Sequence, residues 1–495
     1  MPSLAALLPD GLPIPPARVL RVEALAGLVV GLALIPEAIS FSVIAGVDPR
    51  VGLFASFTMA VTIAFVGGRP AMISAATGAT ALVLASVSKR YGVDYLVAAV
   101  LLAGVVQISL GLLGVAKLMR YVPRSVSVGF VNALGILLFV AQWPNLEGVP
   151  AVVYALVAGG LAIILFFPRL TRAVPAPLVA IVVLTAVTVG FGMDSVPTVG
   201  DKGELPNSLP LPGLPDVPLS LHTLAVIALP AVTMAIVGLL ETQMTARLVD
   251  ELTETGSDKA RESWGQGVAN LVTGIFGGMG GCAMIGQTMI NVKAGARTRL
   301  STFLAGVFLL ILVVGLSPVV SKIPMAALVA VMFIVAYSTF DWESVKPAHL
   351  KRLPRSETAV MVVTVVLTVA TGNLSIGVGA GVVVAALLFA RRVAHLVEVD
   401  RVEDPDLSNC LYSVHGEVFF ASEQELIDAF RYAEDPPQVI IDFSRAHLWD
   451  ASAIAAIDAI ESHYRRYEVE VEITGLNEHS ESLHERLSGQ LAPTH

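Results

Sequence analysis

The chain has 495 residues, of which 55% are hydrophobic and 14% are charged. Soluble proteins carry about a quarter charged residues, so this composition excludes a soluble globular protein and indicates a polytopic membrane protein. The net charge of −9 is divided unevenly, because residues 1–400 sum to +4 and residues 401–495 sum to −13. We therefore predict a transmembrane domain over residues 1–398 and a separate, acidic domain over residues 399–495. An acidic domain lacks the basic surface that nucleic acid requires.

The N-terminal stretch argues against a signal peptide, and the cysteines argue against a disulfide-rich or metal-binding protein. Residues 1–16 contain Asp10 and several prolines, but neither the charged n-region nor the apolar h-region of a signal peptide, so we expect no cleaved leader. The two cysteines, Cys282 and Cys410, are too few for a disulfide framework, and neither belongs to a metal-binding cluster.

Fourteen apolar segments follow along the transmembrane domain, several of them shorter than the ~20 residues that a full span needs. The Pro-rich stretch Pro197–Pro218 separates seven segments from seven, and we predict that it links two halves. The segments of the first half are Ala24–Ala45, Val51–Val66, Ala76–Val87, Tyr95–Leu113, Ser125–Val140, Val149–Phe167 and Leu178–Phe191. Those of the second half are Thr223–Leu248, Trp264–Phe276, Gly286–Ala296, Leu300–Leu316, Ile323–Tyr337, Ser356–Ala370 and Ile376–Phe389.

The distribution of basic residues supports fourteen crossings. When the N-terminus is placed in the cytoplasm, 20 Lys and Arg residues fall in cytoplasmic connections and five in external ones. Membrane proteins concentrate Lys and Arg in their cytoplasmic connections. The chain is therefore predicted to be a multi-pass membrane protein with both termini, and hence the acidic domain, in the cytoplasm.

A short repeat links the two halves. Residues 71–74 (Ala-Met-Ile-Ser) recur as residues 283–286 (Ala-Met-Ile-Gly), each copy after a glycine pair and just before the third segment of its half. Because seven is odd, two homologous halves must lie in opposite orientations, which is an inverted repeat. Paired, broken segments at matching places in two such halves mark a substrate site. We predict half-helices at the third and tenth segments.

Two opposed half-helix N-termini form an anion site without a cationic side chain, because each carries unsatisfied N–H groups and about half a positive charge. The side chains of Thr77, Gln287 and Thr288 add donors. The alternative is that the small residues here only allow close helix packing, and that Phe41 faces lipid or the core. The candidate substrate-binding residues are Phe41, Ala75, Ala76, Thr77, Gly78, Gly286, Gln287 and Thr288.

Two carboxylates lie deep in predicted spans at equivalent places, Glu37 in the first and Glu241 in the eighth. An ionised carboxylate is costly there and usually has a function. Burial favours the neutral form, so either residue can couple anion movement to a proton. Glu241 and Thr245, one helical turn apart, can alternatively hold Na⁺ through their oxygens. A purely structural carboxylate that is hydrogen-bonded to a broken helix is the remaining alternative.

The acidic tail alternates between predicted strands and helices, which indicates a small α/β module. It contains neither a Gly-rich phosphate loop nor a His/Cys constellation, and no nucleophile–base or metal set occurs elsewhere, so an enzyme is not supported. The predicted strands and helices are Val414–Phe420, Glu423–Tyr432, Pro437–Ser444, Ala451–Arg465 and Val469–Gly475.

These features resemble the sulfate permease (SulP) family of anion transporters over nearly the whole chain. The tail resembles the STAS domain that follows such membrane domains, through Val439–Ser444 and Asp450–Ser452. The membrane-domain motifs are Leu32–Ala38, Gly238–Glu241 with Leu248–Asp250, and, as the most specific, Ile290–Ser301.

The resemblance implies a core domain of spans 1–4 and 8–11 and a gate domain of spans 5–7 and 12–14. It implies that the anion lies between the half-helices and that the core moves past the gate like an elevator. It further implies a homodimer. We expect a location in a bacterial inner membrane, a cytosolic protein partner of the STAS domain and no resident cofactor.

Two departures refine the expectation. Many members have Ser-Arg where this chain has Gly286-Gln287, which weakens any channel-like or exchange-type reading. The chain is closer to the bicarbonate-transporting branch, which uses Na⁺, but Glu241 stands where we expect Asp in sodium users, and Glu favours a proton. In the tail, Ala451 replaces the Ser of the usual Asp-Ser-Ser, so a phosphorylation switch is not expected.

Our first hypothesis is therefore a secondary transporter that carries out proton-coupled symport of a dicarboxylate, bicarbonate or sulfate. A sodium-coupled bicarbonate symporter is the alternative, and a nucleobase permease of the same architecture comes after it, since the STAS-like tail argues against it. A hypothesis from another class is a membrane-tethered regulatory module whose tail is the working part.

Overall fold

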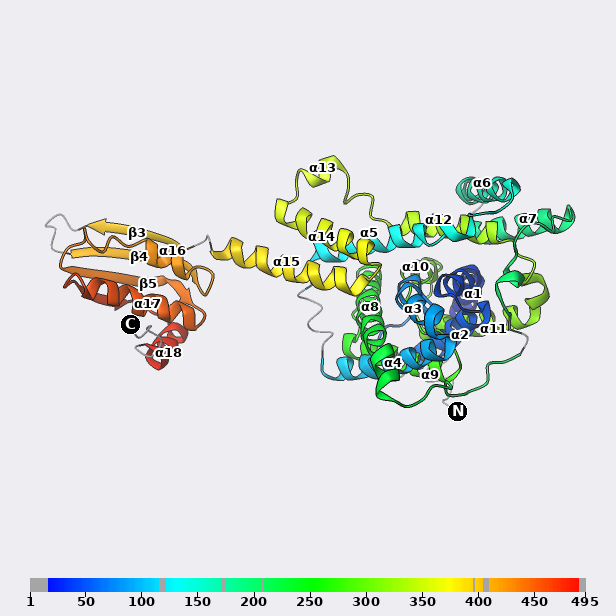
Figure 1. The fold of residues 1–495 in the computed structure, drawn as a ribbon, viewed down its shortest axis with the longest axis horizontal. Helices are drawn as coiled ribbons and strands as arrows, with labels where there is room; N and C mark the ends of the chain where they lie inside the picture. Colours follow the sequence, from blue (N-terminus) through cyan, green and yellow to red (C-terminus); the bar gives the residue numbers. More distant parts are fainter. Residues whose placement is uncertain are drawn as a thin grey trace. The chain divides into compact units, whose positions relative to one another are not determined.

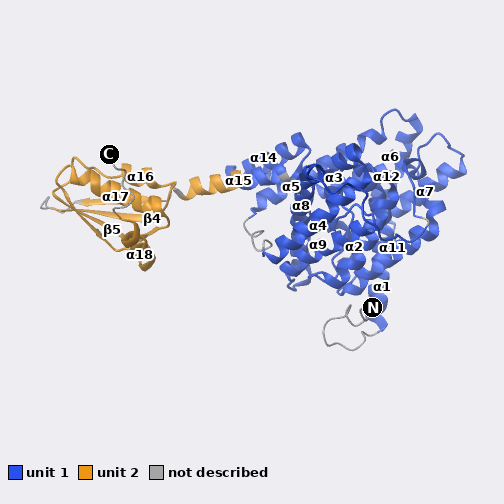
Figure 2. Cartoon of the chain, turned by 60° about the horizontal axis from the view of Figure 1, so that its bottom comes forward, with its two compact units in different colours: residues 1–382 blue, residues 383–495 orange. Residues whose placement is uncertain are grey.

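The computed structural model describes residues 17–114, 122–170, 175–206, 208–394, 397–403 and 409–488. The expectation about the N-terminal sixteen residues, and the basic residues Lys117, Arg120 and Arg172, lie outside this part of the chain. Two compact units emerge, residues 1–382 and residues 383–495 (Figure 2). The division between the units falls within the long helix α15, and therefore before the predicted domain boundary at 398/399.

Each of the fourteen predicted segments coincides with one helix of the structure. Eight helical stretches among the described residues are long and apolar enough to cross a bilayer, and α7 and α12 are shorter apolar helices. The count of fourteen crossings therefore stays a prediction. The helices of the first half are α1 (Ala17–Ala45), α2 (Pro49–Val66), α3 (Gly78–Tyr91), α4 (Val93–Leu112), α5 (Arg124–Val140), α6 (Ala151–Phe166) and α7 (Ala176–Gly190). Those of the second half are α8 (Leu221–Thr253), α9 (Lys259–Ile275), α10 (Ile285–Lys293), α11 (Arg299–Val320), α12 (Met325–Thr339), the short α13 (Pro347–Leu350), α14 (Arg355–Thr371) and α15 (Leu374–Ala394).

The helices of the first unit form two packed groups. In one, α1–α4 pack against α8–α11, with α4 on α9, α1 on α11 and α2 on both α9 and α11. In the other, α5 packs against α12 and α14, and α6 packs against α7 and α12 (Figure 1). The groups meet where α1 contacts α12 and α3 contacts α5. Each group takes helices from both halves of the chain, as an inverted repeat requires.

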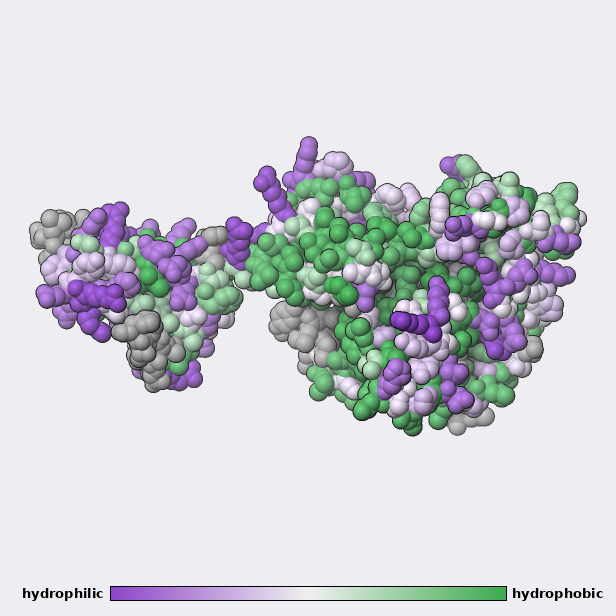
Figure 3. All heavy atoms as spheres, viewed as in Figure 1, coloured by the Kyte–Doolittle hydropathy of each residue, from purple (hydrophilic) through white to green (hydrophobic). Residues whose placement is uncertain are grey.

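Glycines allow the closest of these contacts. A Cβ on Gly104 of α4 would lie 2.8 Å from the carbonyl oxygen of Gly267 on α9, and one on Gly267 would lie 2.6 Å from that of Gly104. Small residues at helix interfaces let backbones approach within a membrane, where lipid competes equally well for apolar side chains. The outward surface of this unit is accordingly apolar over wide areas (Figure 3), with exposed side chains such as Leu165 and Val182.

Two short strands cross inside the first group. β1 (Ser74–Ala75) pairs antiparallel with β2 (Cys282–Ala283), so that Ser74 faces Ala283 and Ala75 faces Cys282. Helix α3 starts shortly after β1, and α10 starts shortly after β2. A Cβ on Gly281 would lie 1.9 Å from the carbonyl oxygen of Ala75, so the crossing requires glycine there. The starts of the half-helices α3 and α10 are therefore held together by one pair of hydrogen-bonded strands.

Buried amides fix this crossing. The Asn270 side chain of α9 accepts from the Gly281 N–H at 2.9 Å and donates to the Gly281 carbonyl at 3.1 Å. Asn291 of α10 donates to the carbonyl of Ala71 at 2.9 Å. Both asparagines are fully buried, and they satisfy backbone groups that non-helical chain leaves unpaired within a membrane protein.

The second unit contains a four-stranded sheet in the order β3-β4-β5-β6, antiparallel between β3 and β4 and parallel elsewhere. Its elements after α15 are β3 (Glu398–Glu403), β4 (Asn409–Val418), α16 (Glu423–Asp428), β5 (Gln438–Leu448), α17 (Ala451–Arg465), β6 (Glu470–Thr474) and α18 (Glu478–Leu487). The α/β prediction is confirmed, although β3 and α18 were not predicted. The core lies between the sheet and α17 and includes Tyr412, Phe443 and Tyr464.

Candidate substrate site between the half-helices

A cavity of about 530 Å³ lies where the two helix groups meet. One wall comes from α1, α3, α8 and α10, and the facing wall comes from α5 and α12. The lining residues are Glu37, Phe41, Thr77, Gly78, Phe130, Val131, Leu134, Leu138, Glu241, Met244, Met284, Ile285, Gly286, Gln287, Met289, Lys293, Val335, Ser338 and Thr339. The set includes the starts of both half-helices and both predicted intramembrane carboxylates.

The two half-helices begin differently. Thr77 is the N-cap of α3, and its hydroxyl accepts a long hydrogen bond from the Thr80 N–H at 3.4 Å. Met284 is the N-cap of α10 and supplies no side-chain hydrogen bond. The first N–H groups of a helix have no partner within the helix. The start of α10 therefore offers more backbone donors to the cavity than the start of α3, and Gln287 adds its amide.

Two glycines line the cavity at the starts of the half-helices, Gly78 in α3 and Gly286 in α10. A Cβ on Gly78 would lie 2.5 Å from Leu138 Cδ2 on α5 and 3.0 Å from Phe41 Cε1 on α1. A Cβ on Gly286 would meet nothing within 4 Å. Gly78 thus allows α5 and Phe41 to close against the start of α3, whereas Gly286 leaves open space for a ligand beside α10.

Glu241 is tied to the other half of the chain through a thiol. The Cys282 Sγ donates to Glu241 Oε2 at 2.9 Å, and it also lies 3.2 Å from the hydroxyl of Thr77. Cys282 is fully buried and Glu241 nearly so. A carboxyl of α8 is thereby connected, through β2, to the residue that caps α3.

Glu37 is half-buried and follows Pro36 inside α1. A proline within a helix removes one backbone hydrogen bond and disturbs the preceding turn, and the Ser40 hydroxyl donates to the Pro36 carbonyl at 2.8 Å. The Gln287 side chain interacts with the Glu37 carboxyl. Each carboxyl therefore contacts a residue of the β2–α10 segment, Glu37 through Gln287 and Glu241 through Cys282.

Four predicted site residues do not line the cavity. Ala75 lies in β1, and Ala76 donates its N–H to Ser56. The Thr288 hydroxyl accepts from the Ile73 N–H at 3.0 Å, so it supports the crossing and not a ligand. The Thr245 hydroxyl donates to the Glu241 backbone carbonyl at 2.8 Å, away from the carboxyl. The structure brings together the other seven: Phe41, Thr77, Gly78, Gly286, Gln287, Glu37 and Glu241.

The sequence reasoning missed three features of the site. Cys282 was considered only as a disulfide or metal candidate. Lys293 stood in the most specific motif without a role, although it lines the cavity. The facing wall from α5 and α12, including Phe130 and Leu138, carried no sequence signal, because apolar residues in a span look alike whether they face lipid or a cavity.

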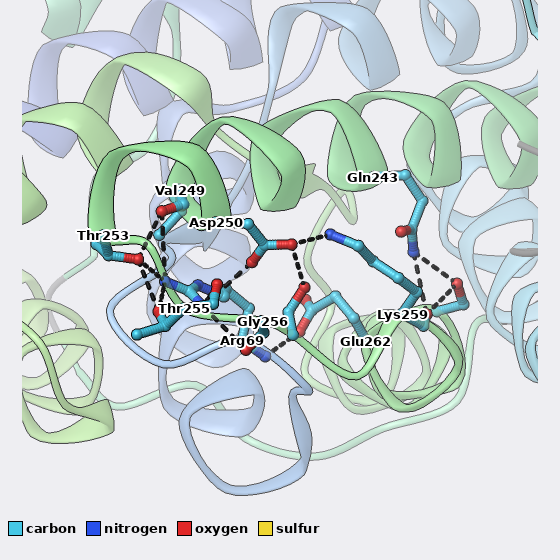
Figure 4. A network of polar contacts seen from close by, with 11 residues as sticks. Arg69, Gln243, Val249, Asp250, Thr253, Thr255, Gly256, Lys259 and Glu262 are labelled. Carbon is cyan, nitrogen blue, oxygen red and sulfur yellow. Dashed lines mark hydrogen bonds and ion pairs between the residues drawn. The ribbon is translucent and has the colours of Figure 1, made fainter. Parts of the chain in front are cut away.

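A polar network outside the cavity holds the connection between α2 and β1 (Figure 4). The buried Arg69 guanidinium lies 3.1 Å from Asp250 Oδ1 and donates to the Thr255 carbonyl at 3.0 Å. Asp250 also pairs with Lys259, and Glu262 Oε2 accepts the N–H of Arg69 at 2.9 Å. Burial lowers the pKa of Arg69, and Asp250 and Glu262 oppose that shift. The network connects the segment that precedes β1 to the end of α8 and the loop between α8 and α9.

Comparison with known proteins agrees with this architecture. A family model described as the sulfate permease family matches residues 20–157 and 152–364, and a STAS domain model matches residues 397–488. The Bacillus subtilis (strain 168) protein named "Putative sulfate transporter YbaR" is 52% identical over 469 residues, which are 95% of this chain and 97% of that protein.

Two solved structures share the fold. The transmembrane domain of the bicarbonate transporter BicA from a cyanobacterium has a TM-score of 0.66 and 26% identity, and the match covers 75% of this chain and 98% of that one. The murine Solute Carrier 26 family member A9 anion transporter, in its inward-facing state, has a TM-score of 0.82 at 16% identity over 96% of this chain and 88% of that one. The protein therefore belongs to the sulfate permease family of multi-pass membrane transporters, with a STAS domain at residues 397–488.

Proposed function

We propose that the protein is a secondary active transporter that takes up a dicarboxylate, bicarbonate or sulfate together with a proton. One observation carries the proposal: both half-helix starts and both intramembrane carboxyls line the same cavity of about 530 Å³. An anion beside Gly286 would accept from the first N–H groups of α10, from the Gln287 amide and from the Thr77 hydroxyl. The names of the relatives, "Putative sulfate transporter YbaR" and the bicarbonate transporter BicA among them, agree with this substrate class.

The coupling ion follows from the charges around the anion. A carboxylate beside a bound anion is repelled by it, and protonation removes that repulsion. Anion binding and protonation of Glu37 or Glu241 therefore favour each other, and such linkage is reciprocal. Among the two, Glu241 makes the closer contact with the crossing strands, through Cys282. We assign the proton primarily to Glu241.

Sodium-coupled bicarbonate uptake is the second candidate, supported by the likeness to BicA over 98% of that chain. Na⁺ prefers several oxygen ligands, as other hard cations do. Glu241 instead has a thiol as its side-chain partner, and the Thr245 hydroxyl points to a backbone carbonyl one turn away. This side-chain arrangement favours a proton over Na⁺ as the coupling ion.

Alternating access would come from movement between the two helix groups. We propose that α1–α4 with α8–α11 form the core, and that α5–α7 with α12, α14 and α15 form the gate. The cavity lies between these groups, so sliding of the core would carry the anion across the membrane. We further propose a homodimer in a bacterial inner membrane, both termini in the cytoplasm, and a cytosolic protein as partner of the STAS domain.

The test is uptake of radiolabelled anions into proteoliposomes, with sulfate, bicarbonate and a dicarboxylate each measured with and without inward proton and sodium gradients. A proton gradient should drive uptake of at least one anion in the wild type. Glu241→Gln should abolish this dependence, and Glu37→Gln should weaken it. If both variants take up the anion at wild-type rate with unchanged pH dependence, the assignment of the proton is wrong. Uptake that needs sodium alone would favour the second candidate.

A further inference from the structure

Three of the described residues that line the central cavity are ionisable: Glu37, Glu241 and Lys293. Each carboxyl has a polar side-chain partner, Gln287 for Glu37 and Cys282 for Glu241. Lys293 forms no ion pair with any residue that the structure describes, and its side chain is exposed. The cavity is therefore lined by one lysine that is paired with none of the described acidic residues.

Helix α10 presents this ammonium along the same face as the candidate anion site. Gly286, Met289 and Lys293 all line the cavity, and residues three, four or seven apart lie on one side of an α-helix. Lys293 follows Gln287 by six positions, so its Cα lies about 9 Å farther along the helix axis. The helix thus leads from the ammonium at its last turn to the free N–H groups at its first turn.

The surroundings make this single charge effective. Most other lining side chains are apolar, among them Phe130, Leu134 and Leu138, and apolar walls strengthen an electrostatic interaction relative to bulk water. Two carboxyls and the negative end of the α10 dipole would repel an anion that enters at this end of the cavity. Within the described lining, Lys293 is the cation that offsets them.

We propose that Lys293 is a specificity-determining residue, which draws small anions into the cavity and passes them along α10 to the half-helix N-termini. The proposal rests on the anion transport proposed above and adds the residue that selects for negative charge. Because Coulomb energy scales with ligand charge, loss of the ammonium should affect a dianion such as sulfate about twice as much, on a logarithmic scale, as a monoanion such as bicarbonate.

The chain offers a matched control in Arg247 on α8. Its side chain is also exposed and without a described ion pair, but it lines a neighbouring cavity of about 240 Å³ and not the central one. The two cavities share Met244. An effect that depends on general surface charge should appear in both variants, whereas an effect inside the central cavity should appear only when Lys293 is changed.

The experiment measures KM and maximal rate of anion uptake into proteoliposomes for wild type, Lys293→Gln, Lys293→Arg and Arg247→Gln at low and high ionic strength. Lys293→Gln should raise KM about three- to tenfold at low salt with little change in maximal rate, and the rise should shrink at high salt. Lys293→Arg and Arg247→Gln should stay within about twofold of wild type. Thermal unfolding in detergent checks that each variant is folded, and Lys293→Met replaces Lys293→Gln if the latter is not.

The outcomes separate the two proposals. If wild-type protein takes up no anion of the panel, the proposed function fails. If the wild type transports an anion and both neutral variants of Lys293 keep its KM, the assignment of Lys293 alone is overturned. An equal KM rise in Arg247→Gln would also overturn it, because the charge would then act from the surface and not from within the cavity.

Discussion

Cys282 donates its thiol hydrogen to Glu241 across 2.9 Å and at the same time lies 3.2 Å from the hydroxyl of Thr77. The three residues come from β2, from α8 and from the cap of α3. A change in the charge of Glu241 therefore alters the hydrogen bonding of Cys282, which in turn contacts the residue that caps α3. This contact provides a physical route between the proposed proton carrier and the proposed anion site.

Replacement of Cys282 tests this route. Cys282→Ala removes the donor and leaves a buried carboxyl without its side-chain partner, while Cys282→Ser keeps a donor of similar size. A hydrogen bond to a charged group contributes about 1.5–3 kcal/mol, so Cys282→Ala should slow uptake about tenfold or more and Cys282→Ser much less. Initial rates at saturating anion measure the effect. Equal rates in the two variants would mean that the thiol contributes by packing alone.

Gly78 and Gly286 form a matched pair for substitution by alanine. At Gly78 the new methyl would lie 2.5 Å from Leu138, whereas at Gly286 it would enter open space. Overpacking typically costs about 1–3 kcal/mol. Gly78→Ala should therefore hinder the approach of α5 and reduce uptake strongly, and Leu138→Ala in the same chain should restore part of it. Gly286→Ala should leave stability unchanged and raise KM by occupying ligand space.

The Arg69 network should contribute to stability more than any exposed ion pair does. Arg69→Met removes the buried partner of Asp250 and three backbone contacts of the guanidinium. We expect a loss of about 2–4 kcal/mol in the free energy of unfolding, since removal of one partner of a buried pair is costly. Lys346→Gln, which breaks the exposed pair with Glu343, should cost less than about 1 kcal/mol. Thermal unfolding of the detergent-solubilised protein compares them.

Glu461 on α17 should make the stability of the STAS domain depend on pH. Burial, and then the charge of Asp458, raise the pKa of Glu461 above its usual value of 4.5. Below that value both folded and unfolded chains are protonated. As the pH rises above it, only the unfolded chain ionises fully, so stability falls. Glu461→Gln should therefore stabilise α17 at pH 7.5 by about 0.5 kcal/mol, given its partial exposure, and the gain should shrink near pH 5.

Hydrogen exchange of α17 amides in the full-length protein measures this effect. Asp458→Asn serves as the companion variant, because removal of the neighbouring charge should give a smaller gain in the same direction. A gain from Glu461→Gln that is the same at pH 5 and pH 7.5 would show that repacking, and not charge, is responsible.

The repeat of residues 71–74 at 283–286 predicted the right regions but the wrong register. The echo equates Ser74 with Gly286, but α3 begins at Gly78, after Ser74, whereas α10 begins at Ile285, before Gly286. The match of letters is therefore not an alignment of positions. Sequence composition locates broken helices well, because Gly and short apolar length are local properties, but the start of a helix depends on tertiary hydrogen bonds such as those of Asn270 and Asn291.

The same distinction explains which site residues were predictable. Glu37 and Glu241 are costly in a membrane wherever they point, so sequence alone identifies them. Thr77 and Gln287 follow from the half-helix starts. Thr245 and Thr288 looked equally suitable, but their hydroxyls satisfy backbone groups. The Thr245 hydroxyl bonds the carbonyl one turn earlier in its own helix, whereas the partner of Thr288, the Ile73 N–H, is distant in sequence. In the tail, charged residues outnumber apolar ones in both β3 and α18, so neither segment looked like a core element in the sequence.

The crossing of β1 and β2 also fixes when the site can come into existence. Ser74 pairs with Ala283, which is synthesised roughly two hundred residues later. The strand pair that precedes α3 therefore cannot form while only the N-terminal half has emerged from the ribosome. Neither half of the chain contains a complete site, and the pairing at Gly281 leaves no room for a substitute strand with a larger residue there. Because the cavity is lined by residues of both halves, we expect anion binding only after the second half has been inserted into the membrane.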